Sequence, residues 1–164
     1  MKKFILFISL FLFVFICRSC VHTHEPEIGT TMICKADYIK NNVTIDSLLF
    51  SENDIEYFHL STNELKLKAT HKLTTIQHFN NFRFYMGKDS IFTAHLALDV
   101  MSSIINDLVF YQTLKAGKLY LKDGYPVNTS SSESLTIRAQ NSAKRAVNWQ
   151  KFIDRMDYLN TLRN

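Results

Sequence analysis

The stretch from residue 90 to residue 115 constrains the fold most, because its apolar side chains would cover most of the circumference of an α-helix. One helical face would hold Ile91, Ala94, Leu98, Met101, Ile105, Leu108 and Val109, widened by Leu96, Ala97, Val100 and Ile104. A helix that is apolar on several sides needs neighbours on those sides, so the pattern predicts a central helix. Asp99, Asn106 and Asp107 interrupt the apolar run too heavily for a membrane span.

Two more long helices are predicted on either side of this stretch. Residues 132–162 carry apolar side chains at spacings of three and four, and residues 63–86 carry a similar apolar face. Signals for helix starts and ends separate the three stretches: Ser61-x-x-Glu64, Asp89-Ser90 and Ser130-x-x-Glu133 as N-terminal caps, and Gly87 and Gly117 as C-terminal caps.

The first stretch has a second interpretation. Residues 64–69 alternate polar and apolar side chains as a strand does, so a β-hairpin over 63–86 stays open as an alternative. Residues 43–45 suggest a strand, Ser51-x-x-Asp54 suggests the start of a short helix, and residues 118–126 suggest a small hairpin or an ordered loop.

These patterns together predict a mostly α fold. We expect an antiparallel bundle of about three long helices with minor strand content, and a mixed α+β layer is the alternative. The 164 residues contain four Gly and two Pro, which excludes collagen-like and Pro-rich architectures, and 46% hydrophobic residues exclude a disordered chain. Residues 32–164 are predicted to form a single helical domain.

The first residues predict export. Lys2 and Lys3 precede thirteen residues, 4–16, in which only Ser9 is polar, the pattern of a secretory signal peptide over residues 1–19. The Ser19-Cys20 dipeptide resembles the cleavage site of bacterial lipoproteins, which implies that Cys20 becomes an acylated first residue. Residues 20–31 would then be a lipid-anchored tether.

Other forms of processing stay open. A soluble periplasmic or secreted protein is the alternative to an anchored one in the bacterial cell envelope, and in that case Cys20 and Cys34 could form a disulfide. In a eukaryotic secreted protein, Asn42 and Asn128 would start possible glycosylation triplets. If Cys20 is acylated, Cys34 is the only remaining thiol of the mature chain.

The charge balance argues against a nucleic-acid partner. The chain has 19 Lys and Arg against 15 Asp and Glu, a formal charge of +4. Removal of the leader takes away Lys2, Lys3 and Arg18 but no acidic residue, which leaves a nearly neutral mature chain. We therefore expect no nucleic-acid binding.

No strong catalytic motif occurs, and we predict a protein that is not an enzyme, with no catalytic residue and no cofactor. On a helix, His95 and Asp99 would be neighbours, and Ser102 and Asn106 would extend the polar stripe. A carboxylate beside an imidazole is the arrangement of a general base, so this stripe is the candidate ligand site. A solvated stripe or a buried hydrogen-bonded pair is the simpler explanation.

Metal ligands are weakly indicated, and we assign no metal site. His22 and His24 near the mature N-terminus are the candidates, because imidazoles suit Zn, Cu or Ni. His71 and His78 are seven residues apart, which is too far to share one metal on a helix without a third ligand. Cys34 has an unspecialised context for a nucleophile.

The last predicted helix offers a possible partner-binding face of Lys144, Lys151 and Arg155. The function expected from these features is that of a small cell-envelope lipoprotein whose helical domain binds a protein or another macromolecule without chemistry, in an assembly, inhibitor or immunity role. A module that binds a small molecule or a metal is one alternative. A hydrolase of unfamiliar type that uses His95 and Asp99 is the other.

Overall fold

Strands rather than helices make up most of the domain. The computed structural model describes residues 30–40, 43–71, 73 and 76–164, so the leader, Cys20, His22 and His24 lie outside the described residues. The elements in chain order are β1 (Met32–Lys40), β2 (Val43–Ser51), the 3-10 helix η1 (Glu52–Asp54), β3 (Ile55–His59), β4 (Glu64–Leu67), the 3-10 helix η2 (Ile76–His78), β5 (Asn81–Met86), β6 (Asp89–Leu98), β7 (Ile105–Gln112), β8 (Leu119–Tyr125), α2 (Ser132–Tyr158) and β9 (Leu162–Arg163).

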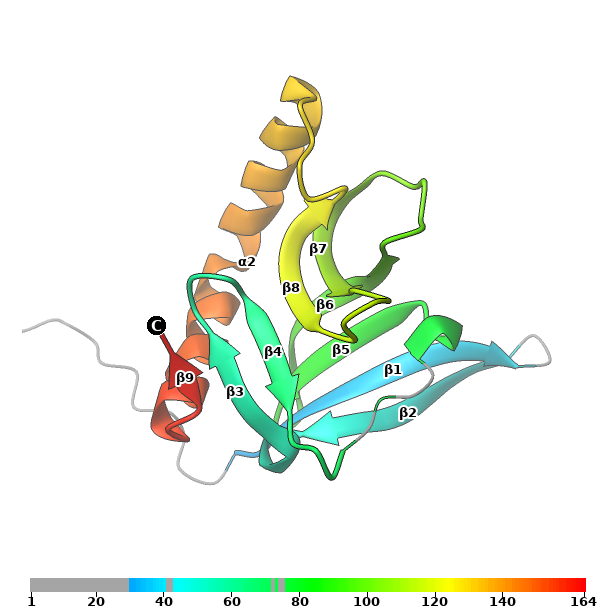
Figure 1. The fold of residues 1–164 in the computed structure, drawn as a ribbon. Coiled ribbons are helices and arrows are strands. Elements are labelled where there is room, and N and C mark those ends of the chain that lie inside the picture. Colours follow the sequence, from blue (N-terminus) through cyan, green and yellow to red (C-terminus); the bar gives the residue numbers. More distant parts are fainter. Residues whose placement is uncertain (1–29, 41–42, 72, 74–75) are drawn as a thin grey trace, which may run out of the picture.

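All the strands belong to one mixed sheet, in the order β2-β1-β5-β6-β7-β8-β4-β3-β9. Neighbours are antiparallel, except that β6 and β7 are parallel and β3 and β9 are parallel. Strands β2 and β3 lie near opposite ends of this order, yet only the three residues of η1 join them. The sheet must therefore curl, as Figure 1 shows, while α2 lies against β6, β7 and β8.

The predicted helical bundle is wrong, and the central helix over 90–115 is instead the strand pair β6 and β7. The sheet is covered on both faces at this point. Ala94 and Phe110 pack in the main core on one face, whereas Ala97 and Val109 pack in a second cluster on the other. A strand buried on both faces has an almost continuous apolar run, which periodicity does not distinguish from a buried helix.

The predicted helix over 63–86 is also wrong, because this stretch contains strands β4 and β5. The two strands do not form a hairpin with each other: β4 pairs with β3 and β8, and β5 pairs with β1 and β6. The two glycines expected to cap helices, Gly87 and Gly117, lie in strand-connecting turns with a φ of +62°.

The third predicted helix is confirmed as α2, but it ends at Tyr158 rather than at residue 162, where strand β9 begins. Its N-cap is Ser131, one residue after the predicted Ser130, and the Ser131 hydroxyl accepts a hydrogen bond from the backbone N–H of Ser134 at 3.3 Å. The predicted strand at 43–45 lies in β2, and the Ser51–Asp54 capping box opens η1. Residues 119–125 form β8, which pairs with β7 and β4.

Aromatic rings fill the core between the curled sheet and α2. Phe82 and Phe110 have ring centroids 4.6 Å apart, and Phe58 and Phe152 are in edge contact at 5.0 Å. Phe152 comes from α2, so the helix is anchored to the sheet by a fully buried ring. Cys34 is fully buried in the same core, and burial raises the pKa of its thiol well above 9.0.

A buried ion pair ties η1 to the end of α2. Arg155 donates two hydrogen bonds to the carboxylate of Glu52, at 2.9 and 2.7 Å, and the backbone N–H of Met32 donates a third at 2.7 Å. The two charged side chains are only 7% and 8% exposed. Burial opposes ionisation of Glu52, but these hydrogen bonds outweigh it and lower the pKa of the carboxyl.

Gly124 is the residue in β8 that allows α2 to approach the sheet. Its φ is +100°, and a Cβ built there would lie 2.7 Å from the carbonyl oxygen of Ile105 and would overlap the guanidinium of Arg138. That guanidinium is buried, and its Nε and Nη1 donate to Asn106 Oδ1 and to the carbonyl of Pro126.

Replacing Gly124 by alanine should therefore lower the free energy of unfolding by about 1–3 kcal/mol, because the new methyl group overpacks a strained position. Urea denaturation followed by circular dichroism measures the change. Gly117→Ala is the matched control: its φ is +62°, but a Cβ there has nothing within 4 Å, so it tests backbone strain alone. Equal losses in the two variants would contradict the role of the Arg138 contact.

In the part of the chain that the structure describes, no helix is long and apolar enough to cross a membrane.

Candidate functional site

A cleft opens where strands β4 and β8 part. The two strands pair only at Glu64 with Tyr120 and at Leu65 with Leu119. Beyond these pairs the β7–β8 turn and the chain that follows β4 enclose a cleft of about 610 Å³. This volume is within the range of small-molecule sites in proteins.

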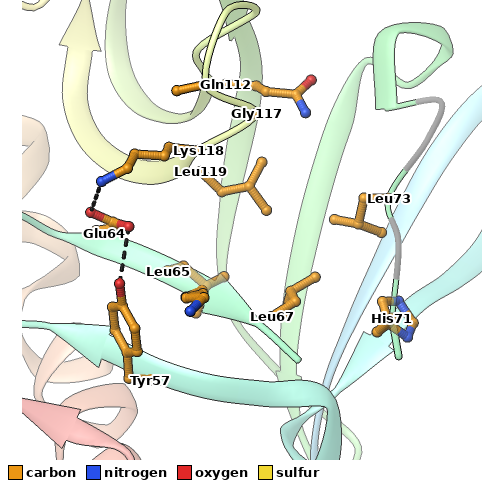
Figure 2. A pocket seen from close by; sticks show the side chains of 12 residues that line it. Tyr57, Glu64, Leu65, Leu67, His71, Leu73, Gln112, Gly117, Lys118 and Leu119 are labelled. Carbon is orange, nitrogen blue, oxygen red and sulfur yellow. Dashed lines mark hydrogen bonds and ion pairs between the residues drawn. The ribbon is translucent and has the colours of Figure 1, made fainter. Parts of the chain in front are cut away.

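Leucines form the floor of the cleft, and polar side chains form its rim. Leu65 and Leu119 are 1% and 7% exposed, and Leu67 and Leu73 are partly buried against the same core. In Figure 2 these leucines lie to one side of a linked polar group, in which Tyr57 comes from β3, Glu64 from β4 and Lys118 from the turn before β8. The polar residues lining the cleft are Tyr57, Glu64, Lys66, His71, Gln112 and Lys118.

Glu64 is the centre of the polar rim. One carboxylate oxygen accepts a hydrogen bond from the Tyr57 hydroxyl at 3.1 Å, and the other accepts from Lys118 Nζ at 3.1 Å (Figure 2). The Glu64 side chain is 13% exposed, whereas that of Lys118 is 51% exposed and can present its remaining N–H donors to the cleft. The hydrogen bond to Glu64 raises the pKa of Lys118, which therefore stays protonated at neutral pH.

Two cations lie over the Tyr57 ring. The guanidinium of Arg163 lies 4.0 Å from its centroid, and Lys66 Nζ lies 5.5 Å away. The hydroxyl is thus fixed toward Glu64.

The two histidines considered as a metal pair are not brought together on one face. His71 Nε2 lies 2.7 Å from the carbonyl oxygen of Leu49, and Nδ1 lies 3.4 Å from a carboxylate oxygen of Asp54. His78 is exposed in η2. Over residues 30–40, 43–71, 73 and 76–164 there is no group of three or more metal-ligating side chains.

The predicted His95–Asp99 pair depended on the helix that the structure replaces with a strand. Residues four apart in a strand are about 13 Å apart. His95 Nδ1 lies 2.7 Å from Asn81 Oδ1, whereas Asp99 accepts from the Tyr111 hydroxyl and from the backbone N–H of Leu114. The hydrogen bond to Asp99 raises the pKa of Tyr111 to about 12. Ser102 is exposed in the connection between β6 and β7.

Two residues of the predicted stripe do line one cavity. His95 and Asn106 lie in a second, more open hollow of about 770 Å³ beside β6, β7 and α2, which we call the asparagine hollow. Its lining residues are Phe79, Asn80, Asn81, His95, Leu96, Leu98, Met101, Ile104, Ile105, Asn106, Asp107 and Asn141.

Two of the three residues of the predicted partner-binding face are exposed, and the third is buried. Lys144 and Lys151 are exposed on α2, and Val147 between them is 70% exposed. Arg155 is 6% exposed and paired with Glu52, so it does not belong to this surface.

Comparison of the chain with protein-family models, with curated proteins and with solved structures gives no significant match. The cleft and the asparagine hollow are therefore interpreted from their geometry and chemistry.

Proposed function

We propose that this chain is a small cell-envelope lipoprotein whose β-rich domain binds a small amphipathic molecule in the cleft without catalysing a reaction. Residues 1–19 direct export, and an acylated Cys20 anchors the protein to the membrane. The observation that carries the proposal is the cleft itself, in which an apolar floor lies beside a fixed polar group. This combination is typical of ligand sites.

The two parts of the cleft define the ligand class. Leu65, Leu67 and Leu119 suit an apolar body. The Lys118 ammonium is oriented by Glu64, and its free N–H groups suit a head group that accepts hydrogen bonds. A fatty acid or a long-chain alcohol has both features.

Non-catalytic binding is favoured over the hydrolase alternative because the residues considered for catalysis are not arranged for it. His95 and Asp99 have separate partners, and the buried thiol of Cys34 has a raised pKa that disfavours the thiolate. Within the described lining of the cleft, no serine or cysteine stands beside a base.

A protein partner on the outer face of α2 is the second candidate. Its support is the exposed row of Lys144, Val147 and Lys151, which share one side of the helix because they are three, four and seven residues apart. Charge reversal at Lys144 and Lys151 should then abolish capture of the partner by the anchored protein, while Val147→Ala should weaken it. Unchanged capture would contradict this candidate.

Calorimetric titration with decanoate, decanol and decylamine tests the cleft. The titrated protein is the complete mature chain carrying Cys20→Ser, which keeps it unacylated. Leu67→Asn should lower the affinity for decanoate and decanol about tenfold, because it places an amide on the apolar floor. Lys118→Met should lower the affinity for decanoate about three- to fivefold and that for decanol less.

Lys122→Met is the matched control, since Lys122 follows Lys118 by four residues, in β8, but donates to the carbonyl of Thr62 outside the cleft lining. Its affinities should equal those of the parent chain. Binding that is unaffected by both Leu67→Asn and Lys118→Met would rule out the cleft as the ligand site. The anchor is tested separately, by the intact mass of the protein from its membrane fraction.

A further inference from the structure

We propose that the asparagine hollow is a second binding site, for a neutral saccharide. It does not share a lining residue with the cleft, so the inference does not depend on the amphipathic ligand. Three properties of the hollow suit such a ligand: its open hydrogen-bonding groups, the pairing of its charged residue and its apolar wall.

The hollow presents polar groups whose orientation is already fixed. His95 is held through Nδ1 by Asn81, Asn106 is held through Oδ1 by Arg138 at 3.2 Å, and Asn141 donates through Nδ2 to the carbonyl of Asn106 at 3.0 Å. The other polar atom of each side chain has no partner among the described residues. These open atoms are His95 Nε2, Asn106 Nδ2 and Asn141 Oδ1.

Asn80 adds a fourth open group at the edge of the hollow. Its carbonyl accepts from the backbone N–H of Leu96 at 3.1 Å, and its backbone N–H donates to Asp37, but its exposed carboxamide has no partner in the described part of the chain. The four side chains together offer both donors and acceptors. Hydroxyl groups donate and accept as well, so a polyhydroxylated ligand matches this set without change of protonation.

The one charged residue among the described lining of the hollow is already paired, with an arginine that it shares with Asp123. Asp107 is the charged residue of its lining, and its carboxylate accepts from Arg145 at 3.2 Å and from the backbone N–H of Leu108 at 2.8 Å. Arg138, which holds Asn106, is only 5% exposed and does not line the hollow. A neutral ligand is therefore favoured over an anion or a cation.

An apolar wall completes the site. Phe79, Leu98, Met101 and Ile104 line one side, and Ile104 is 69% exposed. The start of the connection that carries Met101 and Ile104 is held by the Tyr125 hydroxyl, which lies 3.3 Å from the carbonyl oxygen of Asp99 and 3.0 Å from that of Met101. Such a wall can contact the C–H face of a sugar ring while the amides bind its hydroxyls.

Saturation-transfer NMR tests the proposal, with maltose, cellobiose and N,N′-diacetylchitobiose as probes and the complete anchored protein in a non-glycosidic detergent. At least one sugar should receive saturation from the protein. Asn106→Asp should lower its affinity about tenfold, because it removes the Nδ2 donor yet keeps an acceptor for Arg138. Asn80→Ala should lower it severalfold, and this exposed side chain has no described internal contact that folding needs.

Asn53→Asp, the same change in exposed η1, is the control and should leave the affinity unchanged. Lys118→Met in the cleft should also leave it unchanged, which separates this site from the proposed lipid site. The inference is overturned if none of the sugars receives saturation. It is also overturned if Asn106→Asp and Asn80→Ala bind the sugar with the same affinity as the parent chain does, when circular dichroism shows that both variants are folded.

Discussion

Replacing Arg155 by methionine should lower the free energy of unfolding by about 3–5 kcal/mol, because it leaves the buried carboxylate of Glu52 without its cation. Glu52 would retain only the hydrogen bond from the backbone N–H of Met32. Methionine fills much of the same volume, so the loss reports the missing charge and hydrogen bonds rather than a cavity. Chemical denaturation at neutral pH measures it.

The double variant Glu52→Leu with Arg155→Met is the informative control. It removes both charges together, so it should recover a large part of the loss seen with Arg155→Met alone. A double variant that is as unstable as the sum of the two single variants would show that the pair stabilises through packing instead.

The same pair contributes to the acid sensitivity of the fold. The pKa of Glu52 is lowered from 4.5 in the folded protein, so its contribution is present above pH 4.5 and is lost as the pH falls through the folded pKa. Below that pH the parent chain and Glu52→Gln should differ less in stability than they do at pH 7. Denaturation curves of the parent chain and Glu52→Gln, at pH 7 and at a pH below the folded pKa of Glu52, measure whether the difference in stability becomes smaller.

Replacing Phe152 by alanine should cost about 3–5 kcal/mol as well, because a fully buried ring leaves a cavity between α2 and the sheet. Phe152 contacts Phe58, Phe84, Phe92 and Trp149, with centroid distances from 5.0 to 6.0 Å. These partners come from three strands and from α2 itself, so they cannot close the gap without moving the helix.

The exposed apolar residues of α2 supply the control for Phe152. Leu135 is 51% exposed, and Leu135→Ala should change the stability by less than about 0.5 kcal/mol. Hydrogen exchange adds a local readout: Phe152→Ala should increase exchange in α2 more than in β1 and β5. A uniform increase would contradict an anchoring role of Phe152 specific to the helix.

Helix α2, which buries one face, could be predicted from the sequence, whereas the strand pair β6 and β7, which is buried on both faces, could not. Helix α2 has an exposed side, so its apolar residues recur at helical spacing and its position was predicted correctly. Strands β6 and β7 are covered on both sides, and their apolar run fits a helix equally well. The aromatic and β-branched content, such as Phe92, Thr93 and Phe110, was the available sign of strands.

The candidate sites were harder to predict, because their residues meet only through strand order. Lys118 and Glu64 are 54 residues apart, and no local spacing relates them. His95 and Asn106 were selected because they would share a helical stripe, yet they share the asparagine hollow through a different backbone. Asn80, Asn81 and Asn141 come from other parts of the chain and gave no motif.

The buried ion pair between Glu52 and Arg155 also affects how fast this domain folds. Glu52 and Arg155 are 103 residues apart in the sequence, and β3 has β9 as its outer neighbour. The N-terminal elements η1 and β3 can therefore complete their contacts only when α2 and β9 are present. Contacts between residues so far apart in the sequence make folding slow. For the export that we propose from residues 1–19, slow folding would allow translocation of the unfolded chain to finish before the stable domain forms.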